Sequence, residues 1–338
     1  MTERAPLVSV LMPVRDARPF LDEATASISM QTFRDFEVIV VDDGSVDGSA
    51  TLLERWASAD ARVRVMRQPP TGIVAALERA RSSARGRFLA RMDADDVMAP
   101  TRLEAQRALM EAEPGLMGCG CLIRYFPRDL VRDGARRYER WINAQVTPDQ
   151  IEEALFVECP LAHPSFFLRA RAVQSVGGYR ACSGPEDYDL ILRMWRAGAR
   201  FGKVPEVLHH WRERPDRLSR VDARYSAEAF LATKVGHLTA TLLVGGRPVV
   251  IWGAGPVGKA LSKALRQSGV PLTAFAELDP RKIGQEIHGA PVLDTAEAVA
   301  LRGPLHVAAV GQSGARARIR AVLDAAGMTA MEDFVAVA

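Results

Sequence analysis

The chain has 338 residues and a formal net charge of +3, with 48% apolar and 25% charged residues. This length predicts two domains or one large one, and the composition is ordinary for a soluble globular protein. Because acidic and basic residues nearly balance, we expect no nucleic-acid partner. Only five of the 44 basic residues are Lys. A biased base composition in the source genome explains most of this excess of Arg, and recognition of anions by guanidinium groups is the alternative.

The spacing of the cysteines and the length of the apolar runs indicate the cellular compartment in which we expect the protein. The four cysteines, at 119, 121, 159 and 182, lack paired C-x-x-C spacing, so we expect free thiols in a reducing cytoplasm and no zinc site. There is no run of about 18 apolar residues, so no membrane-spanning helix is expected. The stretch MTERAPLVSVLMPVRD has too short an apolar core for a signal peptide. We expect a cytoplasmic protein, with a peripheral contact at the inner face of the membrane left open.

Strand and helix patterns alternate over the first hundred residues. Continuous β-branched and apolar runs predict buried parallel strands, and apolar residues three and four positions apart predict helices. The expected strands are 7–14, 36–49 with its terminal acidic turn, 63–69 and 87–93, and the expected helices are 18–33, 50–60 and 71–86. This alternation is typical of a doubly wound α/β sheet.

The pattern is less regular after residue 100 and then alternates again. The elements expected up to 246 are helices over 101–115, 171–180, 186–198 and 222–244, strands over 116–126, 164–170 and 202–211, and an Arg- and Pro-rich segment at 212–220. From 247 the chain predicts a strand, a glycine turn and a helix to 269, a strand over 270–280, a strand and a helix within 304–327, and a last strand over 331–338.

Polar side chains follow the strands of the first half at the points where they end. The four ends carry Pro13-Val14-Arg15, Asp42-Asp43, the 68–72 turn and Asp93-Ala94-Asp95-Asp96. Ligands bind at the carboxyl ends of the strands in an open parallel sheet, so if the second and fourth strands lie in one sheet, Asp43 and Asp93 or Asp95 can face one crevice. In an extended segment Asp93 and Asp95 would share a face, and Asp96 would point elsewhere.

Asp93 and Asp95 suit a divalent cation. Mg²⁺ or Mn²⁺ takes one or two carboxylates together with the phosphate oxygens of a substrate. Carboxylates this close repel one another, which opposes their ionisation unless a cation lies among them. The alternative is a solvated acidic turn that caps the next helix. The position after a fourth α/β strand favours the metal site.

Several stretches resemble, in order, the family 2 glycosyltransferases that use nucleotide-diphospho-sugars and have the GT-A fold. They are VSVLMPVRDARPFLDEATASISMQTFRDFEVIVVDDGSVDGS, GIVAALERARSSARGRFLARMDADD, HPSFFLRARAVQSVGGYR, EDYDLILRMWRAG and VPEVLHHWR. The resemblance covers residues 5–220. It implies transfer of a sugar, with inversion and with Mn²⁺ or Mg²⁺, from a UDP-sugar or similar donor to a hydroxyl of a glycan or lipid-linked acceptor. Cell-surface polysaccharide or glycoconjugate synthesis is the implied setting.

The resemblance also implies roles for single residues. Pro13 and Arg15 match the positions that line the base pocket. Asp43 matches the residue that hydrogen-bonds the nucleobase, usually uracil. Asp95 matches the metal ligand of the D-x-D motif, and Asp93 lies near the ribose or the metal.

Asp187, in GPEDYDL, matches the catalytic base of inverting members. Inversion needs a base that takes the proton of the acceptor hydroxyl, on the opposite face of the sugar from the leaving diphosphate. A helix N-terminus stabilises the anionic form of Asp187, which would lower its basicity, and Glu186 or burial could offset this. A helix-capping role without catalytic duty is the alternative.

Other positions carry less information. Glu78 stands where many relatives have Asn, and Arg15 where a tyrosine is frequent, which bears on the sugar and base rather than on the reaction class. For His163 a role near the acceptor or diphosphate and a structural role have equal weight. We expect His209 to be structural and the Arg cluster at 212–220 to be a solvated loop, with contacts to metal, diphosphate or acidic lipid as the alternatives.

A glycine motif opens the C-terminal part of the chain. Gly253, Gly255 and Gly258 have G-x-G-x-x-G spacing, with a strand before them, a helix after them, and Glu277 at the end of the next strand. Such glycines allow a tight turn and close approach of a pyrophosphate to the helix N-terminus. The segment resembles small Rossmann-like domains attached to sugar-modifying enzymes. NAD, another nucleotide, or only a partner remain open as its ligand.

The predicted fold class is therefore α/β, with a GT-A-type doubly wound mixed sheet plus a second, smaller Rossmann-like α/β domain. We expect a glycosyltransferase domain at 1–220, a helical linker at 221–246 and a Rossmann-like domain at 247–338. The alternatives are an NAD-dependent sugar oxidoreductase and a non-catalytic sugar-nucleotide sensor. No Tyr-x-x-x-Lys follows the glycine turn, which counts against the first. The intact D-x-D motif and Asp187 count against the second.

Overall fold

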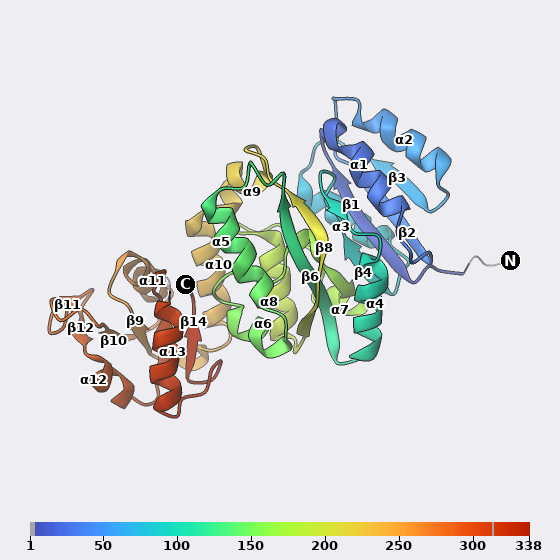
Figure 1. Ribbon diagram of the computed structural model, residues 1–338. Coiled ribbons are helices and arrows are strands. Elements are labelled where there is room, and N and C mark those ends of the chain that lie inside the picture. The colour runs from blue at the N-terminus through green and yellow to red at the C-terminus, as the bar shows by residue number, and fades with distance from the viewer. Residues whose placement is uncertain (1–3, 313) are drawn as a thin grey trace. The chain divides into compact units, whose positions relative to one another are not determined.

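The computed structural model describes residues 4–312 and 314–338, which divide into two compact units (Figure 1). The first unit contains the chain up to Ile151, Pro160–Cys182 and Glu186–Val221. The second contains Glu152–Cys159, Ser183–Pro185 and the chain from Asp222 onward. The sequence-based domain limits stay a prediction. No helix among the described residues is long and apolar enough to span a membrane.

The first unit is built on a mixed sheet with the strand order β3-β2-β1-β4-β7-β6-β8-β5 in the described chain. The strands are β1 (Val8–Val14), β2 (Phe36–Asp42), β3 (Val63–Arg67), β4 (Phe88–Arg91), β5 (Val97–Met98), β6 (Leu116–Phe126), β7 (Phe167–Arg169) and β8 (Arg200–Arg212). Strand β1 pairs in parallel with both β2 and β4, whereas β7 is antiparallel to β4 and β6. The predicted α/β class with a mixed sheet is confirmed.

Helices cover this sheet because their apolar stripes match the buried strands. The helices of the first unit are α1 (Arg18–Ser29), α2 (Ser49–Ala59), α3 (Ile73–Ser83), α4 (Arg102–Ala112), α5 (Asp133–Ala144), α6 (Pro148–Ala154, which ends in the second unit), α7 (Ala170–Ser175), α8 (Glu186–Arg196) and α9 (Leu218–Val221). Leu21 and Ile28 of α1 pack into one core with Val10 and Met12 of β1. Burying such side chains stabilises the fold by about 1.5–3 kcal/mol each.

A buried carboxylate links the first residues of β1 and β2 to the segment before β4 by hydrogen bonds. Glu37 in β2 is 2% exposed. It accepts hydrogen bonds from Ser9 Oγ in β1 at 2.7 Å and from the backbone N–H of Arg85, before β4, at 2.8 Å. Burial opposes ionisation, but these bonds and the Arg85 guanidinium outweigh it and lower the pKa of Glu37. The edge of the sheet where the parallel strands begin is therefore rigidly held.

The second unit contains a smaller sheet with the order β11-β12-β10-β9-β13-β14 in the described chain (Figure 1). Its elements are α10 (Ala227–Thr239), β9 (Val249–Trp252), α11 (Pro256–Gln267), β10 (Leu272–Ala276), β11 (Glu286–Ile287), β12 (Ala290–Leu293), α12 (Thr295–Ala300), β13 (Leu305–Ala308), α13 (Ala315–Ala325) and β14 (Phe334–Ala336). All these strands except β11 pair in parallel. The parallel strands follow the order 3-2-1-4-5 of a Rossmann-like sheet, as predicted.

Several elements differ from the sequence-based expectation. The single helix expected over 222–244 is wrong. A short 3₁₀ turn at Ala223–Tyr225 precedes α10, because the Ser226 side chain accepts a hydrogen bond from the Ala229 N–H and starts a new helix. Helices α5, α6 and α12 and strands β5, β11 and β12 were not anticipated. Most are short elements whose periodicity is too brief to recognise.

Two glycines shape the turn between β9 and α11. Gly253 has a φ of +107°, in the region that favours glycine. A Cβ added to Gly258 would lie 1.9 Å from the carbonyl oxygen of Gly253. Gly258 therefore allows α11 to approach the end of β9. At Gly255, by contrast, an added Cβ would meet no atom within 4 Å.

We expect Gly258→Ala to destabilise the second unit by about 2 kcal/mol, because the new methyl group overlaps backbone that cannot move aside. Gly255→Ala is the matched control and should change the free energy of unfolding by less than about 0.5 kcal/mol. Urea denaturation of the two variants and the parent chain measures both values. Equal stability of the two variants would show that the close approach of α11 is not needed.

Candidate active site

The predicted site residues of the first unit lie at one edge of the sheet. Strands β2 and β4 flank β1, and all three run parallel. Asp43 follows the end of β2, and Asp93 follows the end of β4 by two residues. Both therefore leave the sheet at its carboxyl edge with a single strand between them, which is the expected ligand-binding edge.

Asp43 is a buried carboxylate held by the turn after β3. It is 2% exposed. Its Oδ1 accepts hydrogen bonds from Gln68 Nε2 at 2.7 Å and from the Thr71 N–H at 2.9 Å, and its Oδ2 accepts one from the Gly72 N–H at 2.8 Å. Burial opposes the charge, but these donors outweigh it and lower the pKa of Asp43. The group is an ionised acceptor with a fixed orientation.

The two other predicted base-pocket positions lie beside it. Pro13 is a half-buried residue of β1, and Arg15 is exposed directly after this strand. A guanidinium nitrogen of Arg15 lies 3.9 Å from Asp43 Oδ2. Because the Arg15 side chain is 54% exposed, this ion pair contributes little to stability. It leaves Arg15 able to turn toward another anion.

The three aspartates after β4 form one cluster. Their chain segment is a turn rather than an extension of the strand, and the Asp96 N–H bonds to the Asp93 carbonyl at 3.4 Å. Oxygen atoms of Asp93, Asp95 and Asp96 all lie within 4.8 Å of one another. The expectation that Asp96 points away is therefore wrong, because the turn removes the alternation of an extended chain.

Guanidinium groups counter part of this negative charge. Arg91, 2% exposed, reaches Asp93 Oδ1 at 2.6 Å. Arg214 Nε donates to Asp95 Oδ2 at 2.9 Å, and Arg212 Nε donates to the Asp95 carbonyl at 2.6 Å. The Arg-rich segment 212–220, which begins at the last residue of β8 and was expected to be a solvated loop, thus supplies direct contacts to the acidic turn.

Asp96 is tied to β8 through His209. An Arg102 nitrogen lies 3.0 Å from His209 Nδ1, and His209 Nε2 lies 2.8 Å from Asp96 Oδ2. A guanidinium can only donate, so Nδ1 accepts and Nε2–H donates to Asp96. Burial, followed by the charge of Arg102, lowers the pKa of His209 well below its usual value, so the ring is neutral. The second Asp96 oxygen accepts the Arg212 N–H at 2.7 Å.

The acidic turn carries more negative charge than its surroundings stabilise. Burial, and then the charges of Asp96 and Asp93, raise the pKa of Asp95 to about 7. Burial and Asp93 raise the pKa of Asp96 in the same way. Clustered carboxylates that resist ionisation are the all-oxygen donor set that Mn²⁺ or Mg²⁺ takes. The residues present fit such a cation, with Asp93 and Asp95 as the half-buried members of the cluster and Asp96 as the buried one.

A second group surrounds Asp187, in the first turn of α8. Ligand atoms of Asp187, Glu186 and His163 lie within 4.8 Å of one another. His163 Nε2 lies 3.0 Å from the Tyr179 hydroxyl. Burial, and then the charge of Arg91, keep the pKa of His163 well below its usual value. Asp187 and Asp93 both act electrostatically on Tyr179, so the two acidic groups lie within range of one centre.

Glu78 has a structural partner set. Its carboxylate pairs with Arg81, and its Oε2 accepts the Tyr179 N–H at 3.1 Å. Glu78 therefore fixes the turn that carries Tyr179. Glu78 thereby helps to position Tyr179, whose hydroxyl contacts His163 in the group around Asp187.

The glycine turn of the second unit is open, whereas the acid beside it is occupied. A Cβ added to Gly255 would meet no atom within 4 Å, so there is space at the start of α11. Glu277 Oε2 accepts the Ala254 N–H at 3.1 Å and lies 2.9 Å from Lys282 Nζ, and its Oε1 accepts the Leu278 N–H at 2.9 Å. The turn therefore leaves room for a ligand at the N-terminus of α11. A ribose that binds Glu277 must compete with Lys282.

Three arginines that shape the first unit's site were missed from the sequence. Arg91 stands at the end of an apolar strand, and Arg102 on the inner face of α4, and both are 2% exposed or less. The sequence signal for both was an arginine at a position where the apolar pattern predicts a buried residue. Arg214 lies in a segment without periodicity, and nothing in its neighbours pointed to Asp95.

The family comparison agrees with this geometry. Residues 9–177 match the family described as glycosyl transferase family 2. The chain belongs to this family. The family 2 chain is 29% identical over 229 residues to the glycosyltransferase EpsE of Bacillus subtilis (strain 168), covering 66% of this chain and 79% of EpsE. It is 28% identical over 201 residues to the amylovoran biosynthesis glycosyltransferase AmsE of Erwinia amylovora, covering 59% and 73%.

Solved structures support the fold of the family 2 chain. S. aureus TarS 1–349 in complex with UDP-GlcNAc superposes with a TM-score of 0.56 at 15% identity, over 78% of this chain and 73% of that one. The mannosyltransferase PcManGT from Pyrobaculum calidifontis, in complex with GDP-Man and Mn²⁺, gives 0.53 at 19% identity, over 96% and 86%. The predicted GT-A-type fold is confirmed, and the protein is a glycosyltransferase.

Asp95→Asn should change how stability depends on pH without added metal. The folded pKa of about 7 lies above the unfolded value of 3.8, so the folded state binds the extra proton and loses stability as pH rises from about 4 to about 7. The variant lacks this loss and should be more stable than the parent chain at pH 8 by about 2 kcal/mol. The exposed Asp22→Asn is the control. Thermal unfolding between pH 5 and pH 8 checks this, and parallel pH slopes in all three chains would contradict it.

Proposed function

We propose that the family 2 transferase moves a sugar from a nucleotide-diphospho-sugar, such as a UDP-sugar, to a hydroxyl of a glycan or lipid-linked acceptor. The transfer proceeds with inversion and with Mn²⁺ or Mg²⁺. The observation that carries the proposal is the cluster of Asp93, Asp95 and Asp96 at the carboxyl edge of the sheet, one strand from the fixed acceptor Asp43. Asp187 adds a base outside this cluster.

Asp43 binds the nucleobase in this proposal. Its Oδ1 is filled by Gln68 and Thr71, whereas Oδ2 has a single close donor, the Gly72 N–H. Oδ2 therefore keeps a lone pair for an N–H on the edge of the base. Pro13 and Arg15 line the same pocket.

Asp93 and Asp95 hold the cation in this proposal. A bound divalent cation would supply Lewis-acid stabilisation of the leaving diphosphate. Arg214 already neutralises Asp95 and lies beside this position. It can turn to the diphosphate, since a guanidinium binds phosphate oxygens with two parallel hydrogen bonds. Asp96, tied at both oxygens to β8, keeps the turn in place.

Asp187 is the proposed base for the acceptor hydroxyl. Its neighbours cannot serve as well. Glu186 is only 1% exposed, and burial raises the pKa of Tyr179, which keeps its proton. Asp187 is half-buried at the start of α8. It can therefore accept a proton at a carboxylate oxygen while remaining open to an acceptor.

The named relatives support the setting of the reaction. AmsE is named for amylovoran biosynthesis, TarS was solved with UDP-GlcNAc, and PcManGT was solved with GDP-Man and Mn²⁺. By analogy we propose polysaccharide or glycoconjugate synthesis, at a cytoplasmic site with peripheral contact to the membrane. The oxidoreductase and sensor alternatives find no support in family 2 membership.

For the second unit we propose a phosphate-bearing nucleotide as ligand at Gly253, Gly255 and Gly258. The open space at Gly255 supports this. Lys282 contacts Glu277, which disfavours binding of the ribose of a dinucleotide at that carboxylate. We therefore do not propose NAD as the ligand or a redox reaction for this unit. Binding only to a partner is the alternative.

The decisive test is release of nucleoside diphosphate from a panel of nucleotide-sugars, with acceptor mixtures, with and without Mn²⁺. We expect turnover with at least one donor and loss of turnover on metal removal. Asp95→Asn should lose metal-dependent donor binding in calorimetry. Absence of turnover with every donor would favour the sensor alternative.

Asp187→Asn should separate binding from transfer. Because the amide cannot take the acceptor's proton, we expect transfer to fall about a thousandfold, with donor affinity within about twofold of the parent chain. Calorimetry with the donor and a steady-state transfer assay measure the two effects, and the exposed Asp22→Asn is again the control. Full transfer activity in Asp187→Asn would rule out this base.

A further inference from the structure

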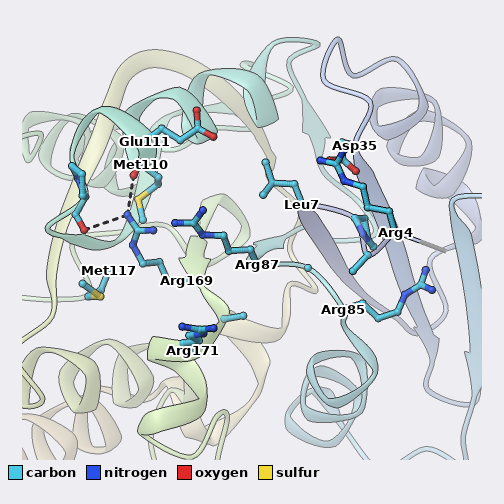
Figure 2. A pocket seen from close by; sticks show the side chains of 15 residues that line it. Arg4, Leu7, Asp35, Arg85, Arg87, Met110, Glu111, Met117, Arg169 and Arg171 are labelled. Atoms are coloured by element: carbon cyan, nitrogen blue, oxygen red, sulfur yellow. Dashed lines mark hydrogen bonds and ion pairs between the residues drawn. The ribbon is translucent and has the colours of Figure 1, made fainter. Parts of the chain in front are cut away.

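The opposite edge of the first unit's sheet contains a hollow of about 960 Å³ (Figure 2). Leu7 and Arg87 stand directly before β1 and β4, Met117 is the second residue of β6, and Arg169 ends the antiparallel strand β7. This amino-edge hollow therefore lies where the parallel strands begin. The proposed donor site lies where they end.

The lining of the hollow is apolar with a basic rim. Leu7, Met110, Pro114 and Met117 supply apolar surface. The guanidinium groups come from Arg4, Arg85, Arg87, Arg169 and Arg171. An apolar surface ringed by cations suits an amphiphilic anion.

Two of these cations have carboxylate partners. Arg4 lies 3.6 Å from Asp35, and Arg85 Nε donates to Glu37 at 3.0 Å. The acidic lining residue Glu111 pairs with Arg107 instead. The carboxylates around the hollow are thus already engaged with other cations.

Three cations have no carboxylate partner in the described part of the chain. Arg169 donates only to carbonyl oxygens, at 2.7 Å to Leu116 and 2.8 Å to Met110. Arg87 and Arg171 are exposed, and no ion pair of either side chain is found within the described ranges. The guanidinium of Arg87 points toward that of Arg169 in Figure 2. Burial, and then the charge of Arg87, lower the pKa of Arg169, as expected where positive charge is uncompensated.

We propose that the amino-edge hollow docks the protein on a bilayer by binding the phosphate headgroups of anionic phospholipids. Arg87 and Arg171 contact the phosphates, and the Leu7 and Met117 surface lies against the adjoining apolar part of the lipid. Charge complementarity carries this choice. The chain's general excess of Arg does not, because the cations that matter are the three without a carboxylate partner in the described chain.

This docking is independent of the proposed transfer. The hollow and the acidic turn lie at opposite ends of the same strands, so a docked protein keeps its carboxyl edge open. The ion pairs of Asp43, Asp93 and Asp95 in the described chain are with other arginines, Arg15, Arg91 and Arg214. Nucleoside diphosphate release in solution therefore reports on one site, and vesicle binding reports on the other.

The test is co-sedimentation of the full chain with vesicles of phosphatidylcholine, with and without phosphatidylglycerol. We expect binding only to the anionic vesicles. The double variant Arg87→Gln/Arg171→Gln should bind them about 30-fold more weakly, since each basic residue at a membrane surface contributes about 1 kcal/mol. Arg55→Gln/Arg196→Gln is the matched control, because these two exposed arginines carry the same charge but do not line the hollow. It should lose less than about threefold.

Three results would overturn the proposal: no binding of the parent chain to anionic vesicles, equal losses in the two double variants, or equal binding to both vesicle types. Calorimetry with inorganic pyrophosphate distinguishes binding of a soluble phosphate from binding of a lipid headgroup. Binding of pyrophosphate that depends on Arg87 and Arg171, without vesicle binding, would assign the hollow to a soluble phosphate and reject the lipid. Unchanged thermal unfolding of the variants shows that folding is intact.

Discussion

The fully buried guanidinium of Arg102 joins three elements at the carboxyl edge of the sheet. From α4 it donates to the Arg91 carbonyl at the end of β4 and to His209 in β8, while its Nε bonds to Gln106 in its own helix. A buried cation without such partners would be strongly destabilising. Its bond to His209 fixes the tautomer that donates to Asp96. The geometry of the acidic turn therefore depends on a residue that does not itself contact Asp93 or Asp95.

The first unit places opposite charges at the two ends of one sheet. Parallel pairing of β1, β2 and β4 brings together the residues that follow these strands, and equally the residues that precede them. Aspartates follow the strands, and burial together with their crowding after β4 raises the pKa of Asp95 and Asp96, whereas arginines precede or flank the strands and remain partly uncompensated. Neither group is fully neutralised by partners among the described residues. This is the basis of our two proposals, a cation with a diphosphate at one edge and lipid phosphates at the other.

The sequence predicted what depends on local pattern. Long apolar strands, amphipathic helices and the acids that end β2 and β4 were identified because their periodicity and spacing are local properties. Contacts between distant segments could not be derived in this way. Arg214 meets Asp95 across more than a hundred residues, and Asp96 turns toward the cluster because 93–96 is a turn rather than an extended strand. Short elements such as β5 form because β8 is available to pair with them.

The hydrogen bonds around Asp43 have a consequence for the choice of base. Because hydrogen bonds from Gln68, Thr71 and Gly72 keep this carboxylate ionised, it offers only lone pairs. A ligand in contact with Oδ2 must present a hydrogen. Uracil and guanine carry a ring N–H on their pairing edge, whereas cytosine and adenine present a lone pair at the corresponding ring nitrogen. At Asp43, repulsion between lone pairs would thus disfavour cytosine and adenine. This selection would depend on the base alone and not on the sugar of the donor.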